Sequence, residues 1–454
     1  MNLEGKRILI YGAGKSGIAA AKLLHKGNAR IVIYDENNQL DIDEVKAKLP
    51  KDFDGSFLLG NISEDLLNTI DLLILSPGVP TDLDLVIRAK EKHIPVWGEV
   101  ELAYCFSKGK IVGITGTNGK TTTTTLVGQI MKTYFDSVFV VGNIGVPYTE
   151  MADTTTEDSV TVAEISSFQL ETIERFKPNV SAILNITPDH LNRHHTMENY
   201  IAAKKNITRN QNMDDVCILN YEDEILREIG SELQSKTKVF YFSSLRPLDK
   251  GIYLEKDNII YHDGNTKTVV CDIHELNIFG RHNYENVMAA VACGISLGVP
   301  MDKIKYAITH FVAVEHRIEY VTTKNGVKYY NDSKGTNPDA SMKAIESMQT
   351  PTLLIAGGYD KGSEYDEWLE SFGDKIRYLV LLGQTREKIA EAAKRHGFHN
   401  IILVDNLKEA VDVCAKNARP GDSVLLSPAC ASWGMFKNYE ERGNLFKKYV
   451  MELV

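Results

Sequence analysis

The sequence of 454 residues lacks a long apolar segment. No run of about 18 apolar residues occurs, so no segment is expected to span a membrane. A secretory signal is also missing, because the chain enters a strand-like run at residues 7–11 without a basic start or a cleavage site. The six cysteines are scattered and form no CxxC pair, which is typical of free thiols in a reducing compartment. We therefore expect a cytoplasmic protein.

Basic residues are too few to outnumber the acidic ones. There are 51 Lys and Arg against 61 Asp and Glu, which gives a net charge of -10. A chain with this balance has no general attraction to nucleic acid or to an anionic membrane, and neither is expected as a partner. Anionic ligands must then be held by local basic groups. The length predicts about three domains at roughly 150 residues each.

Strand-like and helix-like stretches alternate along the chain, which predicts an α/β fold. In the first hundred residues, apolar strands at 7–11, 31–34 and 72–75 are separated by helical spacing such as that at 15–26. A new strand at 111–115 runs into a Gly/Thr-rich loop and begins a second domain. The pattern predicts a Rossmann-like N-terminal domain at 1–98, a central P-loop ATPase-like domain with a mostly parallel sheet at 99–313, and a Rossmann-like C-terminal domain at 314–454.

The central section carries further predicted elements. Strands are expected at 160–163 and 180–184, a helix at 197–209, and short hairpins between residues 239 and 271. The C-terminal section repeats the alternation of strands and helices. Its strands are expected at 352–356, 378–382, 401–404 and 423–426.

A glycine motif, Gly12-Ala13-Gly14-Lys15-Ser16-Gly17, follows the first strand and opens a helix. Asp35 ends the next strand, which matches a dinucleotide-binding fingerprint. Glycine permits the tight turn and lets the backbone approach a diphosphate at the helix N-terminus. The motif alone is typical of an NAD-dependent dehydrogenase. It would also suit a site for any other nucleotide diphosphate, or a tight turn that binds no ligand. Ser76-Pro77-Gly78 also ends a strand, where open parallel sheets bind ligands.

The strongest local signal is the phosphate loop Gly116-Thr117-Asn118-Gly119-Lys120-Thr121, between an apolar strand and a helix. Backbone N–H groups of such a loop cradle phosphates. Lys120 is expected to contact the β- and γ-phosphates and the Thr121 hydroxyl to reach Mg²⁺. The loop is not a strict Walker pattern, because Ile114 stands where its first glycine belongs.

Metal-ligand candidates follow two later strands. Glu164 ends one strand, and Asp189-His190 come after the next, where parallel strands bring side chains to one edge. By composition alone, Lys204 is expected to be a solvated helix lysine. His194 and His195 are adjacent, a poor geometry for one metal, and are expected at the surface.

Longer motifs follow in a set order along the chain: Gly142-Asn143-Ile144-Gly145, residues 164–170, residues 185–191, Ala202-Ala203-Lys204, Gly280-Arg281-His282-Asn283 with Asn286, and Glu315-His316-Arg317. With the phosphate loop, this set resembles the Mur ligase family over essentially the full length. Residues 331–337, 356–361 and 426–443 further resemble the branch of that family that adds D-glutamate. Two positions depart from the pattern: Gly335 replaces a more usual Ala, which we expect to be harmless, and Gly434 replaces a common Asp and is given no role.

The resemblance implies site residues. Catalytic roles fall on Lys120, Glu164, His190 and Lys204. Metal-binding roles, for two Mg²⁺ ions, fall on Thr121, Glu164, His190 and Lys204. Lys204 would carry a carbamate derived from CO₂, which turns the cation into an anion able to bind Mg²⁺. ATP-binding positions are Gly116, Thr117, Asn118, Gly119, Lys120, Thr121, Thr122, Asn283, Arg317 and Asp332. UDP-substrate positions are Gly14, Lys15, Ser16, Asp35, Ser76, Pro77, Gly78, Asn143, Ser166 and Gln169. D-glutamate positions are Thr336, Lys361, Ser432 and Phe436.

The implied function is an ATP-dependent amide-bond ligase of peptidoglycan precursor synthesis. It would add D-glutamate to UDP-N-acetylmuramoyl-L-alanine through an acyl phosphate, release ADP and phosphate, and act as a monomer. Three alternatives stay open: a sister or folylpolyglutamate-type ligase with another amino acid, an NAD-dependent dehydrogenase, and a nucleotide-regulated switch. The dehydrogenase explains the first glycine motif but not the phosphate loop or Lys204.

Overall fold

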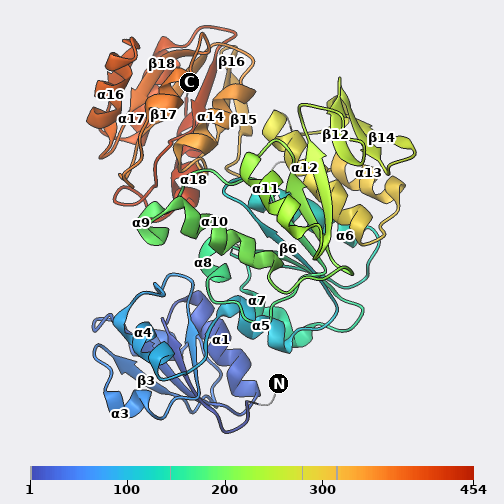
Figure 1. The fold of residues 1–454 in the computed structure, drawn as a ribbon. Coiled ribbons are helices and arrows are strands. Elements are labelled where there is room, and N and C mark those ends of the chain that lie inside the picture. Colours follow the sequence, from blue (N-terminus) through green and yellow to red (C-terminus); the bar gives the residue numbers. More distant parts are fainter. Residues whose placement is uncertain (1–2, 144, 279, 313–314, 454) are drawn as a thin grey trace. The chain divides into compact units, whose positions relative to one another are not determined.

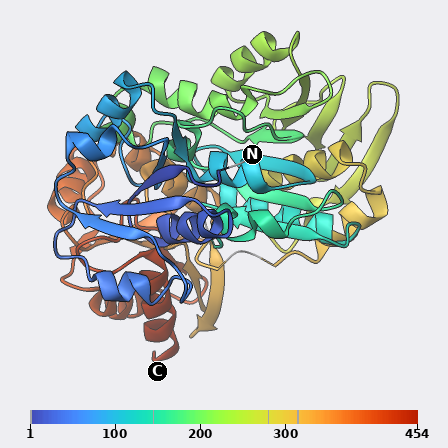
Figure 2. The ribbon, with the colours of Figure 1, turned by 90° about the horizontal axis from the view of Figure 1, so that it is seen from below.

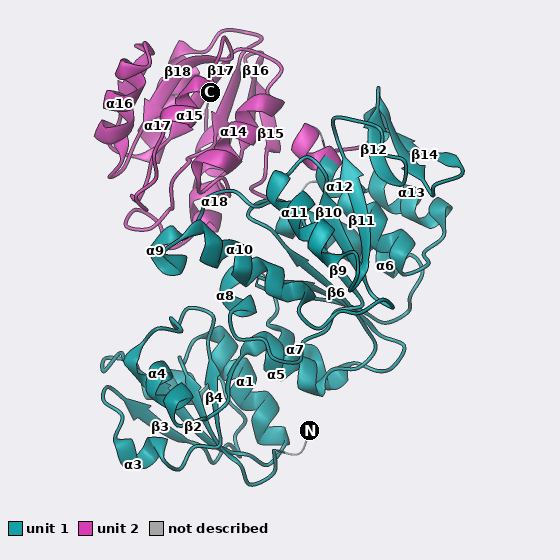
Figure 3. Ribbon diagram, in the orientation of Figure 1, with its two compact units in different colours: residues 1–275, 285–310 teal, residues 276–284, 311–454 magenta. Residues whose placement is uncertain are grey.

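The computed structural model describes residues 3–143, 145–278, 280–312 and 315–453 (Figure 1). The chain divides into two compact units, Met1–Glu275 with Glu285–His310, and Leu276–Tyr284 with Phe311–Val454 (Figure 3). The first unit contains two sheets and the second contains one. The predicted border between residues 313 and 314 falls on two residues outside the described ranges. The domain boundaries therefore stay a prediction.

The N-terminal sheet has five parallel strands in the order β3-β2-β1-β4-β5. They are β1 (Arg7–Tyr11), β2 (Arg30–Asp35), β3 (Ser56–Leu59), β4 (Leu72–Leu75) and β5 (Val96–Gly98), and the helices are α1 (Lys15–Lys26), α2 (Ile42–Lys46), α3 (Glu64–Leu67), α4 (Asp84–Glu91) and α5 (Glu99–Phe106). Alternate strand residues enter two separate cores. Ile8 and Ile10 pack in one, while Leu9 and Tyr11 pack in the other. A parallel sheet covered on both faces needs such continuous apolar strands.

The central sheet has nine strands in the order β14-β13-β12-β11-β10-β9-β6-β8-β7. They are β6 (Lys110–Thr115), β7 (Val138–Gly142), β8 (Val160–Glu164), β9 (Val180–Ile183), β10 (Val216–Asn220), β11 (Lys238–Ser243), β12 (Gly251–Glu255), β13 (Asn258–His262) and β14 (Lys267–Asp272). The helices are α6 (Lys120–Lys132), α7 (Tyr148–Met151), α8 (Ser167–Leu170), α9 (Leu191–His194), α10 (Met197–Lys205), α11 (Glu224–Leu233), α12 (Arg281–Ser296) and α13 (Met301–Thr309), with 3₁₀ turns η1 (Ala152–Thr154), η2 (Asn206–Thr208) and η3 (Ile273–Glu275).

The expected hairpins are correct only in part. β12, β13 and β14 pair antiparallel, and residues 263–264 lie in the turn between β13 and β14. β11, however, pairs parallel with both β10 and β12, so it belongs to the parallel part of the sheet. The helix expected at 197–209 ends at Lys205 and continues as the 3₁₀ turn η2.

The C-terminal sheet has six strands in the order β15-β16-β20-β17-β18-β19, and only the β15–β16 pair is antiparallel. The strands are β15 (Glu319–Lys324), β16 (Val327–Asn331), β17 (Thr352–Ala356), β18 (Ile376–Leu381), β19 (Ile401–Leu403) and β20 (Ser423–Leu426). The helices are α14 (Pro338–Ser347), α15 (Asp366–Glu370), α16 (Arg386–Arg395), α17 (Leu407–Asn417) and α18 (Tyr439–Met451), the last of which leads to the C-terminus marked in Figure 2. Leu354 and Leu353 enter different cores, as in the N-terminal sheet. The predicted α/β class with mostly parallel sheets is confirmed.

Within the described part of the chain, none of the helices is both long and apolar enough to cross a membrane. The six cysteines are free, and five of them are buried.

Candidate active site

The carboxyl ends of three neighbouring strands bring the predicted catalytic segments of the first unit to one edge of the central sheet. β6 lies between β8 and β9 and pairs parallel with both. The phosphate loop follows β6, Glu164 ends β8, and residues 184–190 follow β9. Because parallel strands end at the same edge, residues far apart in the sequence meet there.

The phosphate loop needs glycine at both ends. Gly116 has φ +148° and Gly119 has φ +84°, and a Cβ on Gly119 would lie 2.2 Å from Asn286 Oδ1. α6 then begins at Lys120 and runs for 13 residues, so its N-terminal N–H groups face the loop. The Lys120 ammonium donates to the carbonyl oxygens of Gly116 and Thr117 at 2.9 and 2.7 Å. The sequence-predicted members Thr117, Asn118, Thr121 and Thr122 are all buried.

Residues after β9 brace this loop, although no role was expected for them from the sequence. Asn185 Oδ1 accepts from the Asn118 N–H at 2.8 Å, and its Nδ2 donates to the Asn118 carbonyl at 3.1 Å. The Thr117 hydroxyl lies 3.0 Å from the Thr187 carbonyl and 3.1 Å from the Tyr200 hydroxyl. Asn185 and Thr187 could have been found in the sequence, because they are polar residues that come soon after an apolar strand. Glu164 was identified by the same kind of position, at the end of the strand β8.

Lys204 lies in α10 and is 1% exposed, so the expectation of a solvated lysine is wrong. Its ammonium donates to the Gly116 carbonyl at 2.8 Å and lies 4.6 Å from the centre of the Tyr200 ring. Burial lowers the pKa of Lys204 well below its usual value, and the nearby charge of Lys120 lowers it further. An uncharged amine at this position is nucleophilic.

Glu164 is 2% exposed and is held by Asn143. Asn143 Nδ2 donates to Glu164 Oε1 at 3.1 Å, and the Asn143 N–H donates to the Glu164 carbonyl at 2.8 Å. The hydrogen bond from the Asn143 side-chain amide occupies one carboxylate oxygen of Glu164 and fixes this side chain at the end of β8. Ile144, the third residue of that motif, lies outside the described residues.

His190 precedes α9 as its N-cap residue and has a left-handed conformation with φ +54°. Its ring meets the Phe168 ring edge-on at 4.9 Å, and its Nε2 lies 3.5 Å from Asp189 Oδ2. Left-handed backbone at a residue other than glycine is uncommon and occurs often at functional positions. The ring is partly exposed and carries a nitrogen suited to a metal.

The neighbouring histidines differ from each other. His194 is 4% exposed, with Nε2 at 2.9 Å from the Ser167 hydroxyl and Nδ1 at 3.3 Å from Glu171, so placing it at the surface was wrong. Burial and surrounding cations lower its pKa to about 4. His195 is exposed and lies 3.3 Å from Asp82, as a surface residue would.

The first glycine motif forms the turn between β1 and α1. Gly12 has φ +101°, and a Cβ on Gly17 would meet the Gly12 carbonyl at 1.9 Å, so both positions require glycine. The Ala13 N–H donates to Asp35 Oδ2 at 3.0 Å, and the Ser76 hydroxyl donates to the Gly12 carbonyl at 3.1 Å. These contacts link the turn after β1 to the ends of β2 and β4.

The other predicted UDP-substrate residues lie at the start of α1, after β4 and at the start of α8. Gly14 precedes α1, Lys15 and Ser16 form its first turn, and the Lys15 ammonium donates to the Gly145 carbonyl. Ser166 caps α8 and exchanges hydrogen bonds with Gln169. Ser76, Pro77 and Gln169 are among the residues that line one small pocket. Gly78 has open space at its Cβ position.

The second unit places its predicted residues after β16, β17 and β20. Asp332 follows β16 and is 1% exposed, with Oδ1 accepting from the Ile318 N–H at 3.3 Å and Oδ2 from the Ser427 hydroxyl at 2.7 Å. Burial raises its pKa to about 6, although Arg317 and the Ser427 hydroxyl counteract the rise. Asn283, at the start of α12, is 5% exposed.

The predicted D-glutamate residues share that edge. Thr336 lies in the loop after β16, Lys361 in the loop after β17, and Ser432 and Phe436 in the loop after β20. A bridge between Tyr359 and Ala431 joins the last two loops, and the Gly335 carbonyl accepts from the Ala429 N–H at 2.9 Å. Ser432 is buried, while the other three are half-buried.

The buried Arg442 of α18 also ties these loops together, although no role was expected for it from the sequence. Its guanidinium donates to the Ser333 carbonyl at 2.8 Å and to the Cys430 carbonyl at 3.2 Å. The two departures from the family pattern have structural reasons. A Cβ on Gly335 would lie 2.4 Å from Asp332 Oδ2, and Gly434 has φ +80°, which favours glycine.

Comparison with known sequences gives a consistent result along the chain. The family description "Mur ligase MurD-like, N-terminal domain" matches residues 6–98, "Mur ligase middle domain" matches 114–294, and "Mur ligase, glutamate ligase domain" matches 316–430. A UDP-N-acetylmuramoylalanine--D-glutamate ligase of Lachnoclostridium phytofermentans is 64% identical, over 100% of this chain and 99% of the relative. The protein of the same name in Clostridioides difficile is 46% identical over 100% of both chains.

Solved structures share the fold at low identity. UDP-N-acetylmuramate-alanine ligase MurC of Thermotoga maritima has a TM-score of 0.60 and 18% identity, over 98% of this chain and 99% of that one. MurF of Acinetobacter baumannii has a TM-score of 0.62 and 17% identity, over 98% and 93%.

Proposed function

This chain belongs to the Mur ligase family and is a ligase, and from that premise we propose that it joins D-glutamate to UDP-N-acetylmuramoyl-L-alanine at the expense of ATP. The observation that carries the proposal is the edge where the phosphate loop, Glu164, His190 and the buried Lys204 meet. Relatives that carry the D-glutamate ligase name over their full length support the choice of amino acid. The products are ADP, phosphate and the extended peptide precursor of peptidoglycan. The enzyme acts as a monomer in the cytoplasm.

An amide forms from a carboxylate only after that carboxylate gains a leaving group. Transfer of the ATP γ-phosphoryl group to the alanyl carboxylate supplies one as an acyl phosphate. The amine of D-glutamate then attacks the acyl carbon, the C–N bond forms, the C–O bond to phosphate breaks, and the amine loses a proton. Lys120 and the N–H groups of the phosphate loop stabilise the charge on the transferring phosphoryl group.

The donor set of the loop edge fits Mg²⁺. Glu164 keeps one carboxylate oxygen beyond its bond to Asn143, and the Thr121 hydroxyl stands in the first turn of α6. Mg²⁺ prefers oxygen ligands and neutralises phosphate charge when bound. Glu164, Thr121 and His190 are therefore the residues that would hold it.

Lys204 fits a carbamate. Its burial and its lowered pKa favour the uncharged amine, whose nitrogen can add to CO₂ with loss of a proton. The product carries two oxygens in place of an ammonium group, so the residue changes from a cation to an anion. An anionic Lys204 would add a carboxylate-like ligand for a second Mg²⁺ at the same edge.

The remaining residues bind the two organic substrates. Asp35, Ser76, Lys15 and the turn at Gly14 hold the UDP part, while Asn143, Ser166 and Gln169 approach the muramoyl-alanine end. Lys361 and Thr336 offer an ammonium and a hydroxyl to the two carboxylates of D-glutamate. Asn283, Arg317 and Asp332 serve the nucleotide.

The test is phosphate release from ATP in the presence of UDP-N-acetylmuramoyl-L-alanine, with D-glutamate, L-glutamate, L-alanine or a diamino acid added separately. Release that requires both substrates and favours D-glutamate supports the proposal. Release with a different amino acid keeps the ligase and overturns its acceptor. Release that needs neither substrate overturns the ligase reaction. The variant Lys120→Ala controls for contaminating ATPase activity, because it should release no phosphate in any mixture.

A further inference from the structure

Arg317 lies in an unusual turn of the second unit. The residues on both sides of it are left-handed, with φ +66° at His316 and φ +46° at Ile318. A β-branched residue with positive φ is a genuine outlier, and such a conformation persists only where the surrounding structure over-determines it.

The backbone of the turn is pinned from several sides. The His316 N–H donates to Glu319 Oε2 at 3.0 Å, and the His316 carbonyl accepts from the Lys334 N–H at 3.1 Å. The Ile318 N–H donates to Asp332 Oδ1 at 3.3 Å. Both residues that flank Arg317 are therefore tied to the loop that carries Asp332.

The His316 ring is 4% exposed, and Asn331 Nδ2 lies 2.9 Å from its Nδ1. A Cβ on Gly443 of α18 would lie 2.3 Å from that same nitrogen, so glycine at 443 makes the close approach of the helix possible. α18 thus packs directly against the turn.

α18 also supplies the charge that holds the turn. Lys447 donates to Glu319 Oε1 at 3.1 Å and pairs at shorter range with Glu315. Burial lowers the pKa of Lys447, but its hydrogen bonds to Glu315 and Glu319 outweigh this and leave the pKa raised. One ammonium thus joins a carboxylate before the turn to a carboxylate after it.

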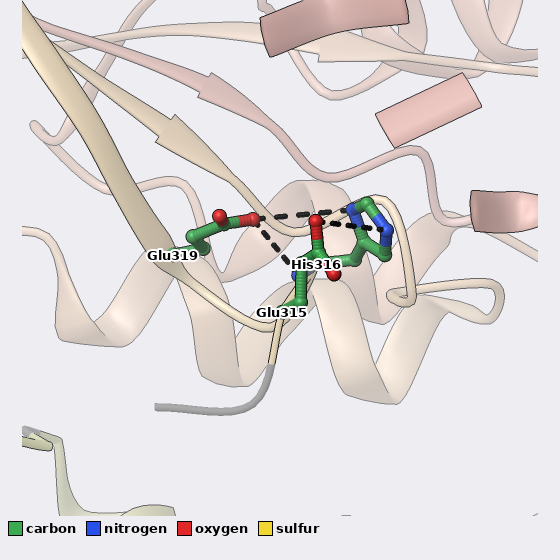
Figure 4. Close-up of side chains that lie close together, drawn as sticks. All are labelled: Glu315, His316 and Glu319. Atoms are coloured by element: carbon green, nitrogen blue, oxygen red, sulfur yellow. Dashed lines mark hydrogen bonds and ion pairs between the residues drawn. The ribbon is translucent and has the colours of Figure 1, made fainter. Parts of the chain in front are cut away.

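Figure 4 shows the side chains of Glu315, His316 and Glu319 turned toward one another, and their potential ligand atoms all lie within 4.8 Å of one another. This spacing alone would suit a metal ion. The ammonium of Lys447 already pairs with both carboxylates, and the Asn331 side-chain amide already lies at hydrogen-bond distance from His316 Nδ1. We therefore interpret Glu315, His316 and Glu319 as part of a brace in which Lys447 forms ion pairs with the two carboxylates.

The Arg317 guanidinium, which the turn presents, can donate at least one further hydrogen bond. Arg317 Nε is buried, and no residue in the described ranges accepts a hydrogen bond from it. A buried N–H without a protein partner is rare in native structures, and a bound ligand is one acceptor that would satisfy it.

We propose that Lys447 is a positioning residue for nucleotide binding, because it holds Glu315 and Glu319 on either side of the turn that presents Arg317. The inference rests on the proposed function, in which Arg317 binds ATP. Lys447 touches no substrate and acts through the turn alone.

The experiment measures ATP binding directly by calorimetry, without the other substrates, and then the KM for each substrate. Lys447→Met should weaken ATP binding and raise the KM for ATP by roughly 10- to 100-fold, the range typical of lost supporting contacts. The KM for D-glutamate and for the UDP substrate should stay within about twofold on the same reasoning. Lys447→Arg should restore ATP binding, because it keeps a cation between the two carboxylates.

Two further variants keep the test decisive. Glu315→Gln removes an exposed carboxylate whose ion pair with Lys447 is part of the brace, so it should shift ATP binding in the same direction without unfolding the protein. Lys448→Met is the matched control, since Lys448 is 64% exposed and pairs only weakly with Glu452 at 3.9 Å. It should bind ATP like the wild type.

The outcomes separate the two hypotheses. A wild-type protein that does not bind ATP overturns the proposed function itself. A wild type that binds ATP, with Lys447→Met and Glu315→Gln folded and binding equally well, overturns the positioning role alone. A uniform rise in all three KM values, not rescued by Lys447→Arg, assigns Lys447 to general stability and also overturns the positioning role.

Discussion

Lys120 and Lys204 donate to the same acceptor, the carbonyl oxygen of Gly116, at 2.9 and 2.8 Å. Two ammonium groups on one oxygen repel each other, and only one of them, Lys204, lies deep in the protein. The repulsion and the burial both favour the neutral form of Lys204. Burial and the nearby Lys120 therefore both lower the pKa of Lys204 at the phosphate loop.

Replacing Lys204 by Ala should reduce ligase activity by a factor on the order of 10² to 10³, because the proposed carbamate would lose its attachment point and its charge. Adding a short carboxylate such as acetate or propionate should restore part of the activity, since it supplies the oxygens of the missing carbamate. Steady-state rates with and without the added acid measure both effects.

Lys205→Ala is the matched control for that experiment, because Lys205 is the next residue of α10 and pairs with Glu232 at the surface. It should keep wild-type activity and gain nothing from acetate. Full activity of Lys204→Ala without any acid would remove Lys204 from the mechanism.

Replacing Glu164 by Gln should raise the Mg²⁺ concentration needed for half-maximal activity by about tenfold or more. The amide oxygen can still accept from Asn143, so the fold of the edge should remain while the negative charge disappears. Magnesium titration of the ligase rate measures the shift. Glu157→Gln, at a side chain 81% exposed, should leave the titration unchanged, and an unchanged titration in Glu164→Gln would argue against a metal role.

Introducing Ala at Gly335 should destabilise the second unit by about 1–3 kcal/mol, because its Cβ would lie 2.4 Å from Asp332 Oδ2 and 2.9 Å from the Ser427 hydroxyl. The new methyl group should also displace Asp332 and weaken ATP binding. Differential scanning calorimetry and nucleotide titration check the two effects. Gly27→Ala, whose Cβ would meet nothing closer than 3.4 Å, is the control, and equal melting of both variants would mean that the loop adapts freely.

Replacing Asp332 by Asn should change how stability depends on pH. The pKa of Asp332 is raised from 3.8 to about 6, so between these values the folded state keeps a proton that the unfolded state has lost. Stability from this group is therefore greatest below pH 4 and falls as the pH rises to 6, by up to about 3 kcal/mol. Asn does not titrate, so its stability relative to the wild type should rise from pH 4 to pH 6 and then level off. Melting at pH 4, 5, 6 and 7 tests this, and parallel curves would contradict it.

Local pattern was enough to place much of the fold. β1, α1 and β4 begin and end where their apolar spacing predicted, because a strand buried on both faces must be apolar throughout. The order of motifs also identified the residues at the carboxyl ends of β6, β8 and β9. These features depend on short stretches of chain.

The failures share a physical cause, which is burial by distant segments. In the sequence of α10, Lys204 resembles a surface lysine. It is shielded from water only because the fold packs the phosphate loop at Gly116 against it. His194 is buried because Ser167 and Glu171 arrive from α8 and the residue after it. β11 has the composition of a hairpin strand, and its parallel pairing is decided by β10 and β12.

The brace of Arg317 comes from the last helix of the chain. Lys447 and Gly443 lie within a dozen residues of the C-terminus, and both contact the turn at 316–319. Because synthesis proceeds from the N-terminus, the turn at 316–319 emerges long before α18 and cannot be braced until that helix has been made. A chain truncated before Tyr439 would retain its phosphate loop, Glu164 and Lys204, yet it would lack the helix that braces the turn of Arg317.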